Sequence, residues 1–340
     1  RGTAPFEKEI MAANLFVKPN SIASRYHGPN KHYKVIAFTA MEPMAQRLAE
    51  GFEGRFTFFK TKWGKFADGT DDIEIGGFYP ENEIRGEHVL FLASFHNNDS
   101  TISQFHVLNA LAEAFVESLT IVLPYYPTGT MERVTKEGVV ATASTLARLF
   151  SNLPRVGNPI RVAVYDLHTL QNRFYLSGSA LASLHSGIPV LVEELRKSKI
   201  NAYAFPDEGS SKRFGQAIKD QFPEWPAIVC GKVRDGDKRI VSIQDGDPAG
   251  LDIIIIDDLV QTGGTLIECA LALKAKGAKS VSAYVTHAVF PKGFDRFLRA
   301  NGGPFDTFYV TNSNPTVTDK LPKDDVFKVL DLLPQIVKDL

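Results

Sequence analysis

The run from Leu251 to Thr265 constrains the fold more than any other part of the chain, because it joins a buried strand to a glycine-containing loop and a helix. Four consecutive isoleucines, residues 253–256, are typical of a parallel strand that is covered on both faces. Asp257 and Asp258 follow at the carboxyl end of this strand. Helical apolar spacing comes after the loop and stops before Gly277, a natural residue to end a helix. The run therefore predicts a strand–loop–helix unit of an α/β protein.

The loop of this unit has the composition of a phosphate site. It consists of Gln261, Thr262, Gly263, Gly264 and Thr265. Backbone N–H groups in such a loop and at a helix N-terminus bind anions, and glycines let an oxygen-rich group approach the main chain. The acidic pair supplies acceptors for two neighbouring hydroxyl groups, as on a ribose ring, at the strand end where α/β proteins bind ligands. For these residues alone, a plain βα turn capped by aspartate is the alternative.

The composition excludes several classes of protein. With 340 residues, 44% of them hydrophobic and 23% charged, the chain is long enough for two globular domains and too balanced for disorder. A net charge of −1 gives no sign of a nucleic-acid-binding surface, so we expect no nucleic-acid partner. No apolar stretch approaches the ~20 residues of a membrane span, so we expect no membrane partner. Cys230 and Cys269 cannot form a disulfide framework, and we interpret them as small buried residues.

Strand and helix patterns alternate in two successive sets. The first occupies residues 31–158, and the second occupies residues 159–322, opening with an apolar strand at residues 160–165. Alternation of this kind predicts two α/β domains with mainly parallel sheets flanked by helices. Residues 1–30 lack the apolar core of a signal peptide, and we expect a native or artificial extension. Residues 323–340 predict a strand and a short helix, for which packing on the N-terminal domain is one option.

Further candidate residues also follow strands. Asp166 and His168 come directly after a strand, where a histidine can contact a Mg²⁺-nucleotide. Asp207 follows another strand in a Pro-Asp-x-Gly segment. Lys232 and Arg234 lie on the same side of a strand that enters a glycine-bearing loop, and two cations on a mobile loop can neutralise charge on a polyphosphate. Taken alone, each has an ordinary alternative: a loop histidine, a turn aspartate, a solvated hairpin.

Together these segments resemble the ribose-phosphate pyrophosphokinases, or PRPP synthetases, and in particular their plant-type, class II members. Residues 257–265 are similar to the PRPP motif, which phosphoribosyltransferases share. The Asp-Leu-His-x-x-Gln segment at 166–171 and the Lys-x-Arg pair at 232–234 resemble segments of the pyrophosphokinases. The resemblance runs from about residue 33 to the C-terminus. It implies two tandem phosphoribosyltransferase-like domains, the second with the PRPP motif.

The resemblance also points to a nucleotide site that departs from the family pattern. Phe66 and Asp68 match a Phe-x-Asn/Asp loop that reads adenine, usually from a neighbouring subunit. Thr70 stands where the family usually has a glutamate, and Thr130 stands where a nucleotide-facing arginine is expected in a proline-rich segment. We therefore expect loose nucleotide specificity and a homo-oligomer with the nucleotide site near a subunit interface.

The implied reaction is transfer of the diphosphoryl group of Mg-ATP to O1 of ribose 5-phosphate, which gives 5-phosphoribosyl 1-diphosphate (PRPP) and AMP. Mg²⁺ is the implied cofactor, and ATP and ribose 5-phosphate are the implied partners. The resemblance implies that residues 261–265 bind the 5-phosphate and that Asp257 and Asp258 hold ribose hydroxyls. It implies metal-side roles for His168, Asp207 and Asp166. Lys232 and Arg234 would cover the transferring group, and Phe66 would stack on the base. We expect a cytoplasmic protein, or a plastid protein whose transit peptide has been trimmed.

Two alternatives remain open. A phosphoribosyltransferase that consumes PRPP would use the same central motif but would leave the His168 segment unexplained. A non-catalytic, PRPP-synthetase-associated regulatory subunit is favoured by Thr70, Thr130 and Gln261. It is opposed by four retained residues: Lys232, Arg234, His168 and Asp207.

Regulation is a further expectation from the resemblance. Class I members respond to phosphate and ADP at a site that includes an arginine. The corresponding stretch here, residues 138–142, has no cation. We therefore expect activity without phosphate. Substitution of the missing arginine by Arg133, Lys136 or Arg85 is the alternative.

Overall fold

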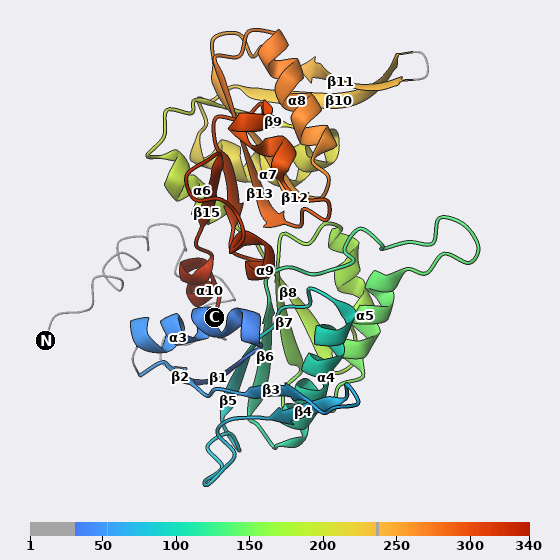
Figure 1. The fold of residues 1–340 in the computed structure, drawn as a ribbon, viewed down its shortest axis with the longest axis vertical. Coiled ribbons are helices and arrows are strands. Elements are labelled where there is room, and N and C mark those ends of the chain that lie inside the picture. The colour runs from blue at the N-terminus through green and yellow to red at the C-terminus, as the bar shows by residue number, and fades with distance from the viewer. Residues whose placement is uncertain (1–30, 53, 236–237) are drawn as a thin grey trace, which may run out of the picture. The chain divides into compact units, whose positions relative to one another are not determined.

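The computed structural model describes residues 31–52, 54–235 and 238–340 (Figure 1). The chain divides into two compact units. The first comprises the residues up to His185 together with Ile336–Leu340, and the second comprises Ser186–Gln335. Each unit contains a large sheet of mainly parallel strands.

The first unit is built on a six-stranded sheet with the order β2-β1-β5-β6-β7-β8, in which every neighbouring pair is parallel. Its strands are β1 (Tyr33–Ala37), β2 (Phe56–Phe58), β5 (His88–Leu92), β6 (Ser118–Leu123), β7 (Ile160–Tyr165) and β8 (Ala180–His185). Its helices are α3 (Glu42–Gly51), α4 (Asn98–Glu113) and α5 (Thr142–Ser151), with short 3₁₀ turns η1 (Thr39–Met41) and η2 (Leu170–Tyr175). A separate antiparallel hairpin pairs β3 (Lys62–Lys65) with β4 (Asp71–Glu74).

The second unit is built on a seven-stranded sheet with the order β11-β10-β9-β12-β13-β14-β15, in which only the β10–β11 pair is antiparallel. Its strands are β9 (Ala202–Phe205), β10 (Ala227–Asp235), β11 (Lys238–Asp245), β12 (Asp252–Val260), β13 (Ser280–Ala288), β14 (Phe308–Thr311) and β15 (Phe327–Leu330). Its helices are α6 (Ile188–Leu195), α7 (Glu208–Gln221), α8 (Gly264–Ala275) and α9 (Pro315–Thr318), with turns η3 (Asp295–Phe297) and η4 (Arg299–Asn301). Helix α10 (Leu333–Asp339) crosses the division between the units.

Strand β12 is buried on both faces, as its isoleucines predict. All four are fully buried, and they alternate between two apolar clusters: Ile253 and Ile255 belong to one, Ile254 and Ile256 to the other. Because side chains alternate along a strand, each cluster lies on its own face of the sheet. The strand that carries the acidic pair is therefore held from both sides.

The structure differs from the expected boundary at residue 158. Strand β7 pairs with β6, and β8 pairs with β7, so both extend the first sheet and the first unit continues to His185. The alternation of patterns shows where a strand lies but not which sheet it joins. The tail is also divided: β15 pairs with β14 in the second unit, whereas Asp339 accepts a hydrogen bond from Tyr165 in the first, with 2.9 Å between Tyr165 Oη and Asp339 Oδ2.

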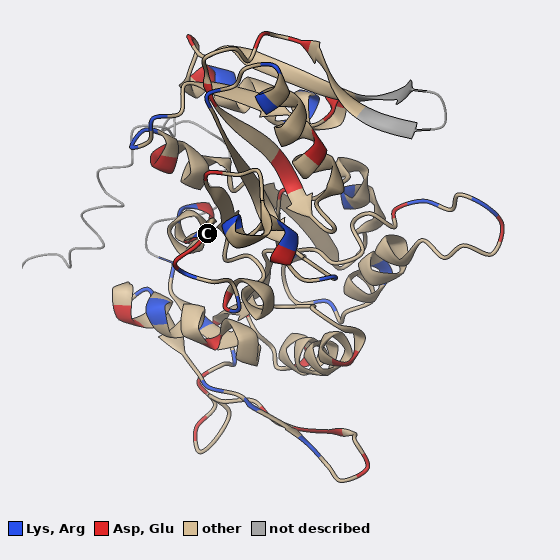
Figure 2. Ribbon diagram, turned by 45° about the horizontal axis from the view of Figure 1, so that its top comes forward, with Lys and Arg blue, Asp and Glu red and all other residues tan. Residues whose placement is uncertain are grey.

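Charge and cysteine placement agree with the compositional analysis. Figure 2 shows acidic and basic residues interspersed over the described elements of both units. Cys230 and Cys269 are buried in one apolar cluster with 3.3 Å between their Sγ atoms. In the described part of the chain, no helix combines the length and apolar character needed to cross a bilayer.

Candidate active site

Strand β12 is longer than its apolar core suggests. It continues through Val260, and it pairs with the long strand β13 through the registers Asp257–Val285 and Val260–Ala288. Asp257 and Asp258 therefore lie within the last residues of the strand rather than in the loop, and only residues 261–263 separate the strand from α8. Backbone pairing fixes the acidic pair more firmly than a loop would.

The two loop glycines have different structural roles. Gly263 caps α8 in the left-handed conformation, with φ +72°, and a Cβ added there would lie 2.1 Å from Cζ of Phe297. A Cβ added to Gly264 would meet nothing within 4 Å. Gly263 is thus required by the turn and its packing. Gly264 instead borders open space at a helix N-terminus, where unpaired N–H groups attract anions.

The loop and helix are fixed at both ends. Gln261 and Thr262 are exposed, and Arg296 donates a hydrogen bond from Nη1 to the carbonyl oxygen of Thr262 at 3.1 Å. At the other end of α8, Gly277 has φ +91°, and the N–H of Ala278 donates to the carbonyl oxygen of Leu273. This arrangement is a Schellman motif, and it confirms the predicted end of the helix.

Two residues of α7 contact the acidic pair. Ser210 Oγ donates to Asp257 Oδ1 at 2.6 Å, and Arg213 Nη1 lies 3.0 Å from Asp258 Oδ2 in a largely buried ion pair. Burial, and after it the neighbouring Asp258 carboxylate, raise the pKa of Asp257 to about 7, although the hydrogen bond from Ser210 opposes the shift. Near neutral pH, the Asp257 side chain is therefore partly a carboxylate, which accepts hydrogen bonds, and partly a protonated acid.

Asp207 lies at the same edge of the second sheet as the acidic pair. It caps the N-terminus of α7, and its Oδ1 accepts the N–H of Ser210 at 2.9 Å. Strands β9 and β12 are parallel neighbours, so residues that follow β9 lie beside the end of β12. Sequence reasoning missed Ser210 and Arg213. Their signal was the spacing of three from Asp207, which places all three residues on one helix face.

The β10–β11 pair forms an antiparallel arm that extends from this sheet (Figure 1). The backbone of Lys232 pairs with Val241, and that of Arg234 pairs with Arg239. The side chains of Lys232 and Arg234 lie outside the described part of the structure. Their orientation stays a prediction.

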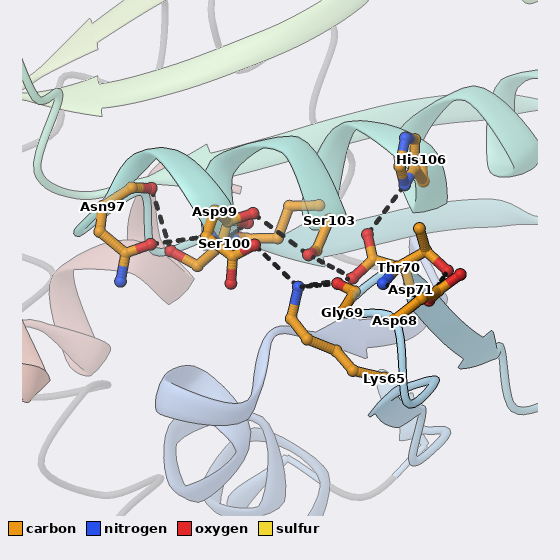
Figure 3. Close-up of polar contacts among 11 residues, drawn as sticks. Lys65, Asp68, Gly69, Thr70, Asp71, Asn97, Asp99, Ser100, Ser103 and His106 are labelled. Carbon is orange, nitrogen blue, oxygen red and sulfur yellow. Dashed lines mark hydrogen bonds and ion pairs between the residues drawn. The ribbon is translucent and has the colours of Figure 1, made fainter.

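In the first unit, the predicted base-reading residues form the tip of the β3–β4 hairpin. Phe66 is 57% exposed there. Its N–H donates to the carbonyl oxygen of Thr70 at 2.8 Å. Asp68 Oδ1 accepts both the N–H and the hydroxyl of Thr70, at 2.9 and 2.6 Å (Figure 3). These two hydrogen bonds lower the pKa of Asp68. Thr70 therefore closes the turn with Asp68 and leaves Phe66 exposed.

The hairpin is fastened to the first half of α4 (Figure 3). Lys65 Nζ pairs with Asp71 at 3.2 Å and with Asp99 at 2.7 Å. Asp71 in turn accepts a hydrogen bond from Ser103 Oγ at 2.8 Å and contacts His106 Nδ1 at 3.0 Å. Exposed pairs are individually weak. Their number at one place nevertheless restricts how the hairpin tip moves.

Thr130 and the Asp166–His168 segment are neighbours in the first unit. A Cβ added to Gly129 would lie 3.5 Å from Cβ of His168, and Asn172 Nδ2 donates to the carbonyl oxygen of Gly129 at 3.2 Å. Thr130 and His168 are exposed, whereas Asp166 is buried and has a φ of +37°. The structure thus brings together two segments that the sequence pointed to separately.

The residues present suit a magnesium ion that arrives with a polyphosphate. Within the described ranges, no three His, Cys, Asp or Glu side chains gather as a complete metal site. Mg²⁺ prefers oxygen ligands, keeps several waters, and is usually held by one or two carboxylates plus substrate phosphates. The carboxylate of Asp207, which lies at the same sheet edge as the acidic pair, is a donor of this kind.

Two mainly parallel sheets and a strand–loop–helix unit with an acidic pair and a glycine loop define a phosphoribosyltransferase-like α/β protein. Residues 33–153 match the N-terminal domain of ribose phosphate pyrophosphokinase, and residues 229–294 match the phosphoribosyl transferase domain. The crystal structure of phosphoribosylpyrophosphate synthetase from Mycobacterium smegmatis shares the fold, with a TM-score of 0.73, 22% identity, and coverage of 91% of this chain and 97% of that one.

Sequence relatives are closer than this structural neighbour. Ribose-phosphate pyrophosphokinase 4 from Oryza sativa subsp. japonica is 44% identical, over 82% of this chain and 86% of that protein. Ribose-phosphate pyrophosphokinase 4 from Arabidopsis thaliana is 42% identical, over 88% of this chain and 89% of that protein. The chain therefore belongs to the ribose-phosphate pyrophosphokinase family. The predicted family with its plant-type likeness, the fold class and the enzyme class are confirmed.

Proposed function

We propose that the chain transfers the diphosphoryl group of Mg-ATP to O1 of ribose 5-phosphate. O1 attacks the β-phosphorus, the bond from that phosphorus to the oxygen bridging to the α-phosphorus breaks, and AMP leaves with that oxygen. The O1 proton passes to solvent or a base. The observation that carries this proposal is the acidic pair at the end of β12, beside the open N-terminus of α8 at Gly264.

The sugar phosphate is bound by the second unit. The 5-phosphate lies against residues 261–265, where helix N–H groups supply donors and Gly264 leaves space. The ribose hydroxyls are held by Asp257 and Asp258, which the backbone pairing of β12 keeps at the strand end. Positioning of this kind is the main contribution a protein makes to phosphoryl transfer.

Cations neutralise the transferring group. Asp207 of the second unit would hold Mg²⁺ together with the ATP phosphates, and the ion would supply charge neutralisation when bound. His168 and Asp166 stay the candidate metal-side residues of the first unit. Lys232 and Arg234 cover the diphosphoryl group and stabilise the charge that grows on it. Phe66 stacks on the base, with Asp68, Thr70 and Thr130 beside the nucleotide.

A coupled assay for AMP, with only ATP, Mg²⁺ and ribose 5-phosphate added, tests this function. We expect AMP and PRPP in equal amounts. Formation of a nucleotide from PRPP and a free base, without AMP from ATP, would instead identify the phosphoribosyltransferase alternative. An inactive chain that alters the rate of a separate, active PRPP synthetase would identify the regulatory subunit.

We also propose a homo-oligomer in the cytoplasm, with the nucleotide site near a subunit interface. The exposed Phe66 at an anchored hairpin tip supports such an interface. Size-exclusion chromatography coupled to light scattering measures the molar mass of the oligomer, and the Phe66→Ala variant provides the comparison. A plastid location is the alternative, since one relative is named "Ribose-phosphate pyrophosphokinase 3, chloroplastic".

Nucleotide selection is expected to be loose. Thr70 and Thr130 remove a carboxylate and a cation from the family's nucleotide site, and the Thr70 hydroxyl is engaged with Asp68. A binding site that lacks polar groups to pair with the base rejects a wrong base by only about 10²-fold, whereas a site that has such groups rejects it by about 10⁴-fold or more. GTP and CTP should therefore give kcat/KM values within roughly 10²-fold of ATP, and the double variant Thr70→Glu, Thr130→Arg should discriminate more. Absence of any PRPP synthesis with GTP and CTP would contradict this prediction.

Activity is expected in phosphate-free buffer, with ADP acting only as a competitor of ATP. A bound dianion needs charge-assisted donors, and residues 138–142 contain no cation. Nearby candidates already have contacts: Arg133 lies 3.5 Å from a Glu132 carboxylate oxygen, and Arg85 lies over the Phe115 ring. Initial rates in a non-phosphate buffer test this. Strict dependence on added phosphate, or ADP inhibition that persists at saturating ATP, would show that another cation provides the regulatory site.

A further inference from the structure

Ser210 connects two carboxylates of the candidate active site. Its hydroxyl donates to Asp257 Oδ1 at 2.6 Å, and its backbone N–H donates to Asp207 Oδ1 at 2.9 Å. The side chain is buried, with 7% of the residue exposed. A single residue in the first turn of α7 therefore orients both the residue assigned to the ribose and the residue assigned to the metal side.

Local structure explains why Ser210 reaches both partners. Asp207 is the N-cap of α7, so its carboxylate accepts the N–H of the residue three positions later. The same position in the helix faces the end of β12, because Arg213, three residues further on, pairs with Asp258. Ser210 therefore lies opposite Asp257, because it shares one face of α7 with Asp207 and Arg213.

The two oxygens of Asp257 have different environments. Oδ1 accepts hydrogen bonds from the Ser210 hydroxyl and from the N–H of Asp258, the latter at 2.9 Å. Oδ2 accepts no hydrogen bond from the residues that the structure describes. Two donors on one oxygen fix the rotation of the carboxylate. The second oxygen remains available to a ligand hydroxyl.

We propose that Ser210 is a positioning residue for ribose 5-phosphate: its hydroxyl holds Asp257 so that Oδ2 accepts a ribose hydroxyl. This inference rests on the proposed function, because it assigns the ribose to Asp257. Ser210 does not touch the reacting atoms, and its contribution is to sugar binding. Loss of the hydroxyl frees the carboxylate to rotate, and part of the preorganisation for the sugar is lost.

The test compares Ser210→Ala with Ser210→Thr, which retains a hydroxyl, and with Ser211→Ala. Ser211 is the matched control, since it is the adjacent serine of the same helix turn. Its N–H donates to the carbonyl oxygen of Asp207, and its hydroxyl makes no hydrogen bond to Asp207 or Asp257 among the described residues. For Ser210→Ala we expect the KM for ribose 5-phosphate to rise about tenfold, while kcat and the KM for ATP change by less than about twofold. Ser210→Thr should restore most of the affinity, and Ser211→Ala should match the parent.

Calorimetric titration with ribose 5-phosphate, together with melting temperatures, completes the test. An unchanged KM and affinity in Ser210→Ala would overturn the proposal, and so would equal losses for ATP and the sugar, or an equal effect of Ser211→Ala. Ser210→Cys, which nearly keeps the side-chain volume but has only a weak S–H donor, replaces Ser210→Ala if that variant does not fold. A parent protein that forms no AMP or PRPP would refute the proposed function, whereas the calorimetric comparison would still decide the role of Ser210.

Discussion

Replacement of Lys232 by alanine is expected to lower turnover by on the order of 10²-fold or more, with binding of ribose 5-phosphate nearly intact. A cation that meets the transferring group mainly in the transition state affects kcat more than ground-state binding. The prediction is based on the Lys-x-Arg pair of strand β10, which lies between Gly231 and Gly236 in the sequence. Single-turnover and steady-state rates of AMP formation measure the effect.

Lys238→Ala is the matched control for this prediction. Lys238 is a second lysine of the same arm, and its backbone pairs with Asp235, but it is not part of the Lys-x-Arg pair. We expect its turnover to fall by less than about threefold, as for loss of a charge that takes no part in the reaction. An unchanged kcat in Lys232→Ala, or equal losses in both variants, would remove the catalytic assignment of Lys232.

Gly264→Val is expected to weaken binding of ribose 5-phosphate and PRPP by about 10²-fold or more and to leave ATP binding largely unchanged. Two charge-assisted hydrogen bonds to the phosphate contribute about 1.5–3 kcal/mol each. When the valine side chain displaces the phosphate and these bonds are lost, the affinity for the ligand falls by about 10²-fold or more. The fold itself has room, since nothing lies within 4 Å of an added Cβ. The melting temperature should therefore stay close to that of the parent.

Gly263→Ala provides the contrast. Its Cβ would collide with Phe297, and its left-handed φ of +72° is strained for alanine, so this variant should lose stability before it loses affinity selectively. Asp258→Asn is a less clean probe, because it also leaves Arg213 without its buried carboxylate. If calorimetry shows that Gly264→Val loses affinity for ATP and for ribose 5-phosphate equally, the assignment of the 5-phosphate to this loop is contradicted.

The sequence predicted best where one local pattern had one structural solution. Four isoleucines gave a doubly covered strand, and Gly277 ended the helix. The end of β12 was less predictable, because its pairing through Val260 depends on the length of β13. Likewise, the sheet that β7 joins depends on its partner β6 and not on its own residues.

The same distinction applies to the site. The acidic pair and glycine loop were visible as a contiguous motif, whereas Ser210 and Arg213 contact it across two elements. The spacing of three from Asp207 places both on one helix face, but this spacing does not show what that face contacts. Only the pairing of β9 with β12 brings their helix to the strand end. Side-chain partners supplied by tertiary contacts therefore escaped the sequence analysis.

The division of the chain into two units separates two kinds of selectivity. The groups assigned to the sugar phosphate, Asp257, Asp258 and residues 261–265, all lie in the unit Ser186–Gln335, while those assigned to the base, Phe66 to Thr70 and Thr130, lie in the other. The hydrogen bonds that orient Asp68 and Asp257 are made within their own units. We therefore expect that substitutions that change the preferred nucleobase can accumulate during evolution without disturbing recognition of the pentose. A family of such proteins would then diversify its phosphate donor while its acceptor stays constant.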